Sequence, residues 1–168
     1  MQEIRVYIVN LGKYTEGDLV GAWFTAPIDM EKVAEQIGLN KQHEEYAVHE
    51  SESPFEINEY TSIDEINHKW ELYQELAGSV CYMDDVEAIL RETDFSLEEL
   101  VEKKDGINFY PGFSSMSDVA YYRVKEDGLL GNVSETMSKY FNYEAYGRDL
   151  EMRGDYIQTS YGIYEIPL

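Results

Sequence analysis

The 168-residue sequence contains one cysteine, four prolines and three histidines, and its 13 lysine and arginine residues face 34 aspartates and glutamates. Because Cys81 stands alone, the chain cannot form an internal disulfide, and this thiol cannot build a metal site by itself. No run approaches the roughly 18 apolar residues that cross a membrane, and the start, MQEIRVYIVN, lacks the regions of a signal peptide. These absences predict a soluble, cytoplasmic protein with no membrane partner.

The motifs of common catalytic and cofactor sites are also missing. The sequence has no phosphate-binding glycine loop, no paired-histidine zinc motif, no nucleophile elbow and no calcium loop. His43, His49 and His68 are irregularly spaced, which favours structural or surface roles over a metal site. The acidic run DDVE (84–87) is typical of a helix start, where acids cap the helix and complement its dipole. We therefore predict no catalytic residue, no metal and no cofactor.

What the sequence has in excess is negative charge, with a formal net charge of −21. Residues 42–102 hold 18 acidic and only two basic residues, so this segment alone accounts for −16 of the total. Nucleic acids and anionic membranes would repel such a chain, so the expected partner is a basic protein surface. The composition is nevertheless 43% hydrophobic and 14% aromatic, which is enough to bury a core and is unlike a disordered acidic tail.

The stretch EEYAVHESESPFEINEY (44–60) has six glutamates and no lysine or arginine, yet apolar residues recur in it at roughly alternating positions. On helices, acids three or four residues apart lie about 5 to 6 Å from one another, comparable to the phosphate spacing along a DNA strand. Glu71 with Glu75 and Glu98 with Glu102 have this spacing. A compact segment of this size is about 27 Å across, and duplex DNA of that length carries roughly 16 phosphates. A track of surrogate phosphates is therefore one hypothesis for residues 42–102.

Hydrophobic periodicity and capping signals predict an α+β fold of three small domains in series, forming an elongated chain. In the first domain, residues 1–61, EIRVYIVN and DLVGAWFTA pair as a hairpin across LGKYTEG, a helix follows between Asp29 and Gly38, and EEYAVHE returns as a strand, giving ββαβ.

The second domain, residues 62–103, is predicted to be an acidic helical bundle. Its first helix has a Ser62/Glu65 capping box, places Ile63, Ile66, Trp70, Tyr73 and Ala77 on one face, and stops at Gly78. A second helix opens at Asp84 or Asp85, and a third has a Ser96/Glu99 capping box. The third domain, residues 104–168, is predicted to be α+β, with helices in SMSDVAYYRVKEDG, SETMSKYF and YEAYGRDLEM and two short strands around Gly162.

Longer blocks of the sequence resemble a known family. RVYIVNLGKY and GDLVGAWF near the start, EEYAVHE followed by INEYTSIDEIN, and above all EDGLLGNVSETMSKYFNYEAYGRDLEM are similar to the ArdA antirestriction proteins of conjugative plasmids and transposons. The likeness covers nearly the whole chain, in order. Ser134 stands where many relatives have proline, a difference that affects only a local turn, because serine is also a good helix N-cap.

The resemblance implies a DNA mimic, a homodimer of elongated three-domain chains that occupies the DNA-binding cleft of multisubunit, type I restriction-modification enzymes. The carboxylates expected to imitate phosphates are Glu44, Glu45, Glu50, Glu52, Glu56, Glu59, Asp64, Glu65, Glu71, Glu75, Asp84, Asp85, Glu87, Glu92, Asp94, Glu98, Glu99 and Glu102. The antirestriction motif and the dimer interface are expected at Gly128, Leu129, Leu130, Gly131, Tyr140, Tyr143 and Tyr146. The main alternative is an acidic adaptor or chaperone that binds a basic nucleic-acid-binding protein without imitating DNA, and an enzyme with a carboxylate site comes third.

Overall fold

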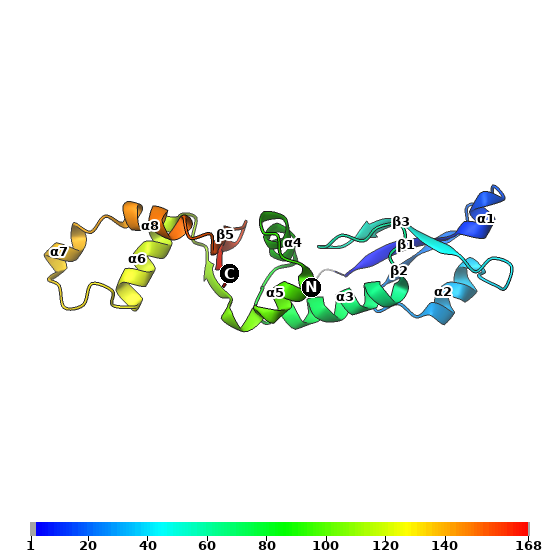
Figure 1. Ribbon diagram of the computed structural model, residues 1–168, viewed down its shortest axis with the longest axis horizontal. Coiled ribbons are helices and arrows are strands. Elements are labelled where there is room, and N and C mark those ends of the chain that lie inside the picture. Colours follow the sequence, from blue (N-terminus) through cyan, green and yellow to red (C-terminus); the bar gives the residue numbers. More distant parts are fainter. Residues whose placement is uncertain (1–2, 168) are drawn as a thin grey trace. The chain divides into compact units, whose positions relative to one another are not determined.

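The computed structural model describes residues 3–167 and shows a mixed α+β protein with two small antiparallel sheets (Figure 1). The elements of this part of the chain are β1 (Arg5–Asn10), α1 (Leu11–Thr15), β2 (Gly21–Thr25), α2 (Met30–Ile37), β3 (Tyr46–Glu52), α3 (Ile63–Leu76), α4 (Met83–Glu92), α5 (Leu97–Glu102), the 3-10 helix η1 (Lys104–Gly106), β4 (Asn108–Pro111), α6 (Met116–Glu126), α7 (Glu135–Lys139), α8 (Tyr143–Glu151), β5 (Tyr156–Gln158) and β6 (Gly162–Glu165).

The chain divides into two compact units. The N-terminal unit takes the chain up to Gly78 together with Phe95–Val101, and the C-terminal unit takes Ser79–Asp94 together with the chain from Glu102 onward. The helices predicted as one middle domain are thus shared, because α3 and most of α5 belong to the N-terminal unit and α4 belongs to the C-terminal unit. The three-domain boundaries, 1–61, 62–103 and 104–168, stay a prediction, as does their elongated serial arrangement.

The N-terminal unit is built on a three-stranded sheet of order β2-β1-β3, in which both pairings are antiparallel. Alternation along β1 buries Val6 and Ile8, while Tyr7 between them is half-buried against Trp23 of β2. Helices α2 and α3 lie along the same side of the sheet (Figure 1), and Val33 of α2 is fully buried there. This confirms the predicted order of strand, strand, helix and strand.

The capping residues of α2 and α3 act as predicted. Asp29 accepts a hydrogen bond from the backbone N–H of Glu31, Gly38 ends α2 in the left-handed region, and Ser62 accepts from the N–H of Glu65. The buried face of α3 is Ile63, Ile66, Tyr73 and Leu76. Of the other two residues predicted for this face, Trp70 is only half-buried, and Ala77 is exposed and lies just after the last residue of the helix.

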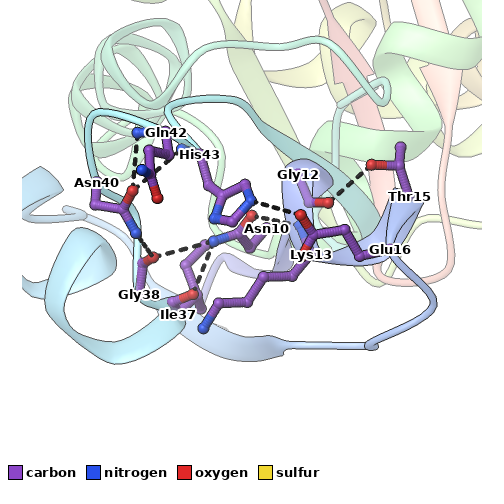
Figure 2. Close-up of polar contacts among 10 residues, drawn as sticks. All are labelled: Asn10, Gly12, Lys13, Thr15, Glu16, Ile37, Gly38, Asn40, Gln42 and His43. Atoms are coloured by element: carbon purple, nitrogen blue, oxygen red, sulfur yellow. Dashed lines mark hydrogen bonds and ion pairs between the residues drawn. The ribbon is translucent and has the colours of Figure 1, made fainter.

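The connection LGKYTEG, predicted as a simple hairpin loop, contains the short helix α1. Buried Asn10 explains why a helix forms there, because its Oδ1 atom accepts from the N–H of Lys13 at 3.0 Å and caps the helix (Figure 2). Its Nδ2 atom donates to the carbonyl oxygens of Ile37, at 3.1 Å, and Gly38, at 3.2 Å. One side chain therefore fastens the start of α1 to the end of α2.

The C-terminal unit combines a sheet of order β4-β6-β5 with packed helices α6 and α8. Its core contains Val119, Ala120, Leu150 and Ile163. Gly147 is buried inside α8, where a Cβ atom would overlap the backbone of Met116. The predicted helices α6, α7 and α8 and the two strands β5 and β6 are confirmed, and Gly162 is the first residue of β6. Strand β4 was not predicted.

Candidate functional site

The structure leaves nearly all of the predicted phosphate-mimicking carboxylates on the surface. Seventeen of the 18 acidic residues named above are exposed. Asp85 is the exception, with an exposed fraction of 1%. The exposed residues lie on β3, α3, α4, α5 and the loops around them, so the acidic surface belongs partly to each unit and is described for each unit separately.

In the N-terminal unit, strand β3 becomes an exposed acidic ribbon halfway along its length. The register between β1 and β3 shifts so that Tyr7 lies opposite Glu50 and Ile8 opposite Val48, which makes His49 the extra residue of a β-bulge. The bulge interrupts the alternation of buried and exposed residues, and all four residues 49–52 are exposed. The sheet therefore holds Glu50 and Glu52 in fixed positions while leaving both carboxylates to solvent.

The loop that leads into β3 is also held in place. The His43 ring lies across Gly12, and its Nε2 atom is 3.1 Å from a carboxylate oxygen of Glu16 (Figure 2). The N–H of Leu11 donates to the carbonyl oxygen of Glu45 at 3.0 Å. Glu44 and Glu45, both exposed, thus begin the acidic stretch from a loop that is bonded to α1.

Helices α3 and α5 carry further exposed acids behind a buried apolar face. In α5, Leu97 and Leu100 are buried, and the predicted capping box is present, because Ser96 and Glu99 exchange two hydrogen bonds of 2.8 and 3.2 Å. In α3, Asp64, Glu65, Glu71 and Glu75 are exposed while the opposite face packs inward.

Some of these acids have a cationic partner. Arg5 pairs with Glu52 at 3.2 Å, Lys69 with Glu65 at 3.2 Å and Arg91 with Glu92 at 3.3 Å. Residues 42–102 contain only two basic residues in sequence, so most of their 18 acids cannot be neutralised from within the segment. The bases of the segment therefore balance only a small part of its negative charge.

In the C-terminal unit, the acids of α4 separate into two kinds. Asp84, Glu87 and Glu92 are exposed, whereas Asp85 is buried and accepts a hydrogen bond from the hydroxyl of Tyr164 at 2.8 Å. Asp85 is therefore not a surface carboxylate, which corrects the prediction. The N-cap position of α4 is occupied by Tyr82, without a side-chain cap, so both aspartates lie in the first turn and neither opens the helix as predicted.

The predicted antirestriction motif forms a tight, exposed turn after α6. Gly128 and Gly131 have φ of 62° and 59°, a left-handed conformation that favours glycine, and the N–H of Gly131 donates to the carbonyl oxygen of Gly128 at 2.8 Å. Leu129 is 53% exposed, and Leu130 is partly buried. Ser134 then accepts from the N–H of Met137 and caps α7, which confirms serine as a helix N-cap at this position.

The three tyrosines predicted for the dimer interface have different environments. Tyr143 and Tyr146 are half-buried against the core cluster, and the Tyr143 hydroxyl donates to the carbonyl oxygen of Ser138. Tyr140 is 83% exposed. Val133 and Met137, which the sequence did not single out, are 45% and 65% exposed and belong to the same segment, which loops out beyond α6 (Figure 1).

A partly buried polar network joins the three strands of the C-terminal sheet. Glu165 accepts from the hydroxyls of Tyr110 and Tyr156, at 2.8 and 2.9 Å, and from Arg123 at 2.9 Å. Burial, the largest cause, and the hydrogen bond to Glu165 together raise the pKa of Tyr156 to about 12, against the opposing effect of the hydrogen bond from Arg123. Burial likewise raises the pKa of Tyr110, reinforced by its bond to Glu165. These tyrosines hold the sheet together as protonated donors.

Two classes of site are not found in the part of the chain that the structure describes. Over residues 3–167, no group of three histidine, cysteine, aspartate or glutamate side chains is placed to hold a metal ion. Over the same residues, no helix has the length and apolar content needed to cross a membrane.

Comparison with known sequences identifies one family. The family model described as "Antirestriction protein (ArdA)" matches residues 6–165, which include almost all of both units. No match was found among curated proteins.

Proposed function

Because the chain belongs to the ArdA family of antirestriction proteins, we propose that it blocks type I restriction-modification enzymes by imitating duplex DNA. Its exposed carboxylates take the place of DNA phosphates in the DNA-binding cleft of the enzyme. The protein acts in the cytoplasm as an inhibitor with no catalytic step and no cofactor of its own.

One observation carries this proposal: 17 acidic residues of one contiguous segment are exposed, and the segment contains only two bases. Like charges on neighbouring positions repel one another and destabilise a fold, and a few substitutions to lysine would reduce this repulsion. The apolar faces of α3 and α5 and the sheet under β3 hold the acids in place in spite of this cost. A cationic partner surface supplies the compensation that the chain itself lacks.

Enzymes that bind DNA contact mainly phosphate and sugar, and these contacts position the enzyme without reading the sequence. A carboxylate track satisfies the same lysine and arginine side chains and releases counterions in the same way. It contains no base edges, so it competes at the cleft independently of the recognition sequence of the enzyme. Inhibition is therefore expected to extend to enzymes with different recognition sites.

We further propose that the chain is a homodimer, joined through the segment that contains the turn Gly128–Gly131, α7 and Tyr140. Residues 103–168 hold nine of the 15 tyrosines and a net charge of only −3, so association there brings little negative charge together. Leu129, Val133, Met137 and Tyr140 are exposed in this one segment, and monomeric proteins rarely leave such apolar patches uncovered.

Two charge-matched variants test the proposed function. The first replaces Glu44, Glu45, Glu50, Glu56 and Glu59 by glutamine, and leaves Glu52 because Arg5 pairs with it. The control neutralises five exposed acids of the C-terminal unit, Asp105, Glu126, Glu144, Asp149 and Glu151. We expect the first variant to need at least about tenfold more protein for half-inhibition of DNA cleavage by a type I enzyme.

The control variant is expected to stay within about threefold of the wild type, because it has the same net charge but keeps the acidic stretch. Equal losses in the two variants would mean that overall charge, and not a phosphate-like surface, determines inhibition. No loss in either would exclude the acidic stretch from the binding surface.

A further inference from the structure

Asp85 raises a question that the proposed function does not answer, because a phosphate surrogate has no use for a buried carboxylate. Its Oδ2 atom accepts from the Tyr164 hydroxyl at 2.8 Å. Its Oδ1 atom is buried and has no hydrogen-bond partner among the described residues. A buried carboxylate with one donor costs stability, and an apolar residue of similar size would fill the same space at less cost.

Tyr164 connects three parts of the C-terminal unit. It is a fully buried residue of β6, and its hydroxyl accepts from the backbone N–H of Cys81 at 3.3 Å while it donates to Asp85. Burial raises the pKa of this hydroxyl, and the hydrogen bond to Asp85 raises it further, so Tyr164 remains a protonated donor. The hydroxyl therefore bonds both the chain just before α4 and the first turn of α4.

Aromatic stacking strengthens the same junction. The Phe109 ring of β4 stacks on Tyr164 with centroids 4.3 Å apart, and the Tyr82 ring stacks on Tyr161 at 3.9 Å and 13°. Tyr82 is the residue before α4, and the other three rings belong to the sheet or to the turn beside it. The N-terminal end of α4 is thus docked on the C-terminal sheet by stacked rings and one hydrogen-bonded hydroxyl.

We propose that Asp85 is a positioning residue: its hydrogen bond to Tyr164 fixes the rotation of α4 on the C-terminal sheet and so sets where exposed Asp84, Glu87 and Glu92 are presented to the partner. Apolar packing of Val86 and Ile89 alone tolerates small rotations of the helix. The buried carboxylate of Asp85 does not tolerate such a rotation, because separation from Tyr164 leaves both of its oxygens buried without a donor. This inference rests on the proposed function only for its consequence, the presentation of the acids.

Hydrogen exchange on the full chain tests the docking, and inhibition of a type I enzyme tests its consequence. Tyr164→Phe removes the donor but keeps the ring, the net charge and every exposed acid. We expect the amides of α4 to exchange about tenfold faster or more, with α6 and α8 unchanged, and inhibition to weaken. Asp85→Leu combined with Tyr164→Phe replaces both partners by apolar groups, and most of the lost protection should return.

Two substitutions of aspartate by asparagine distinguish the effect of the position of α4 from the effect of its charge. Asp85→Asn keeps an acceptor for Tyr164 and should leave exchange and inhibition within about twofold of the wild type, whereas Asp84→Asn removes an exposed charge and should weaken inhibition without changing exchange. The inference is overturned if Tyr164→Phe leaves α4 protected, if it loosens all helices equally, or if Asp85→Asn weakens inhibition as much as Asp84→Asn. A wild-type protein that fails to inhibit would refute the proposed function and leave the exchange result to decide the docking.

Discussion

Gly12 lacks a side chain at the point where the imidazole of His43 crosses α1. The contact lets His43 reach Glu16 and holds the loop from which Glu44 and Glu45 begin the acidic stretch (Figure 2). A Cβ atom at Gly12 would overlap the His43 side chain at two ring atoms and at its Cβ atom, which is not a flexible chain end. At this scale, the absence of one methyl group at Gly12 leaves room for the contact that holds the loop with Glu44 and Glu45.

Gly12→Ala is therefore expected to lower the free energy of unfolding by about 1–3 kcal/mol, because the overlap forces the His43 side chain or the loop to move. Gly78→Ala is the matched control, because a Cβ there meets nothing within 4 Å and the backbone is not in the left-handed region. Urea unfolding of both variants measures the difference. Equal stabilities for the two would contradict the close contact.

At the scale of single elements, capping residues and periodicity predicted most helices and strands. Asp29, Ser62 and Ser96 mark helix starts because their side chains bond locally, and local bonds are visible in sequence. Strand β4 has only four residues, and its place is set by pairing with β6, more than 50 residues away in sequence. Helix α1 has a local cap in Asn10, but the same side chain is also held by bonds to the distant end of α2. Such long-range contacts have no local signal.

The candidate site shows the same limit. Exposure of most acids followed from their composition and spacing, because acids are rarely buried. Asp84 and Asp85 are indistinguishable in sequence, and only the distant Tyr164 separates a surface charge from a buried one. The exposure of Val133, Met137 and Tyr140 likewise depends on how the segment leaves α6, so apolar content alone did not reveal it.

The network beneath the C-terminal sheet predicts instability in alkali. Tyrosine ordinarily ionises near pH 10, and the folded state raises the pKa of Tyr156 to about 12. Between these values the folded protein holds a proton that the unfolded chain has lost, so this contribution is complete below pH 10 and disappears as the pH rises toward 12. Tyr110 and Tyr164 add to the effect in the same direction.

The free energy of unfolding, measured in urea from pH 8 to 11.5, should thus fall steadily above about pH 10. Tyr156→Phe should be less stable at pH 8, because Glu165 and Arg123 lose a partner, but its stability should fall less steeply with pH. Parallel curves for the two proteins would show that Tyr156 ionises as readily in the folded state as in the unfolded chain.

At the scale of the whole molecule, the acidic segment and the proposed dimer interface occupy different parts of the sequence. The acidic surface lies in residues 42–102, and the exposed apolar segment lies in the nearly neutral last third. A homodimer formed by that segment leaves the carboxylates of both chains available to a partner. In the proposed dimer, two copies of the acidic surface would act on one enzyme, and this would increase the apparent affinity without any new contact.

Tyr140→Glu should convert the dimer to a monomer, because it places a charge on the most exposed tyrosine of the proposed interface. Tyr60→Glu is the matched control, since Tyr60 is 78% exposed, lies in the N-terminal unit and gains the same charge. Light scattering coupled to size exclusion gives the mass of each variant. A monomeric wild type would exclude the dimer. A Tyr140→Glu variant that is still dimeric would place the interface elsewhere.

The central claim is that the protein and duplex DNA occupy the same cleft. It is tested most directly by titrating a type I restriction-modification enzyme into fluorescent duplex DNA at a series of fixed concentrations of this protein. Competition at one site predicts that the apparent Kd for DNA rises linearly with the concentration of the protein, without a plateau. A plateau, with enzyme, DNA and protein bound together in one complex, would contradict DNA mimicry and identify the protein as an acidic adaptor that binds outside the cleft.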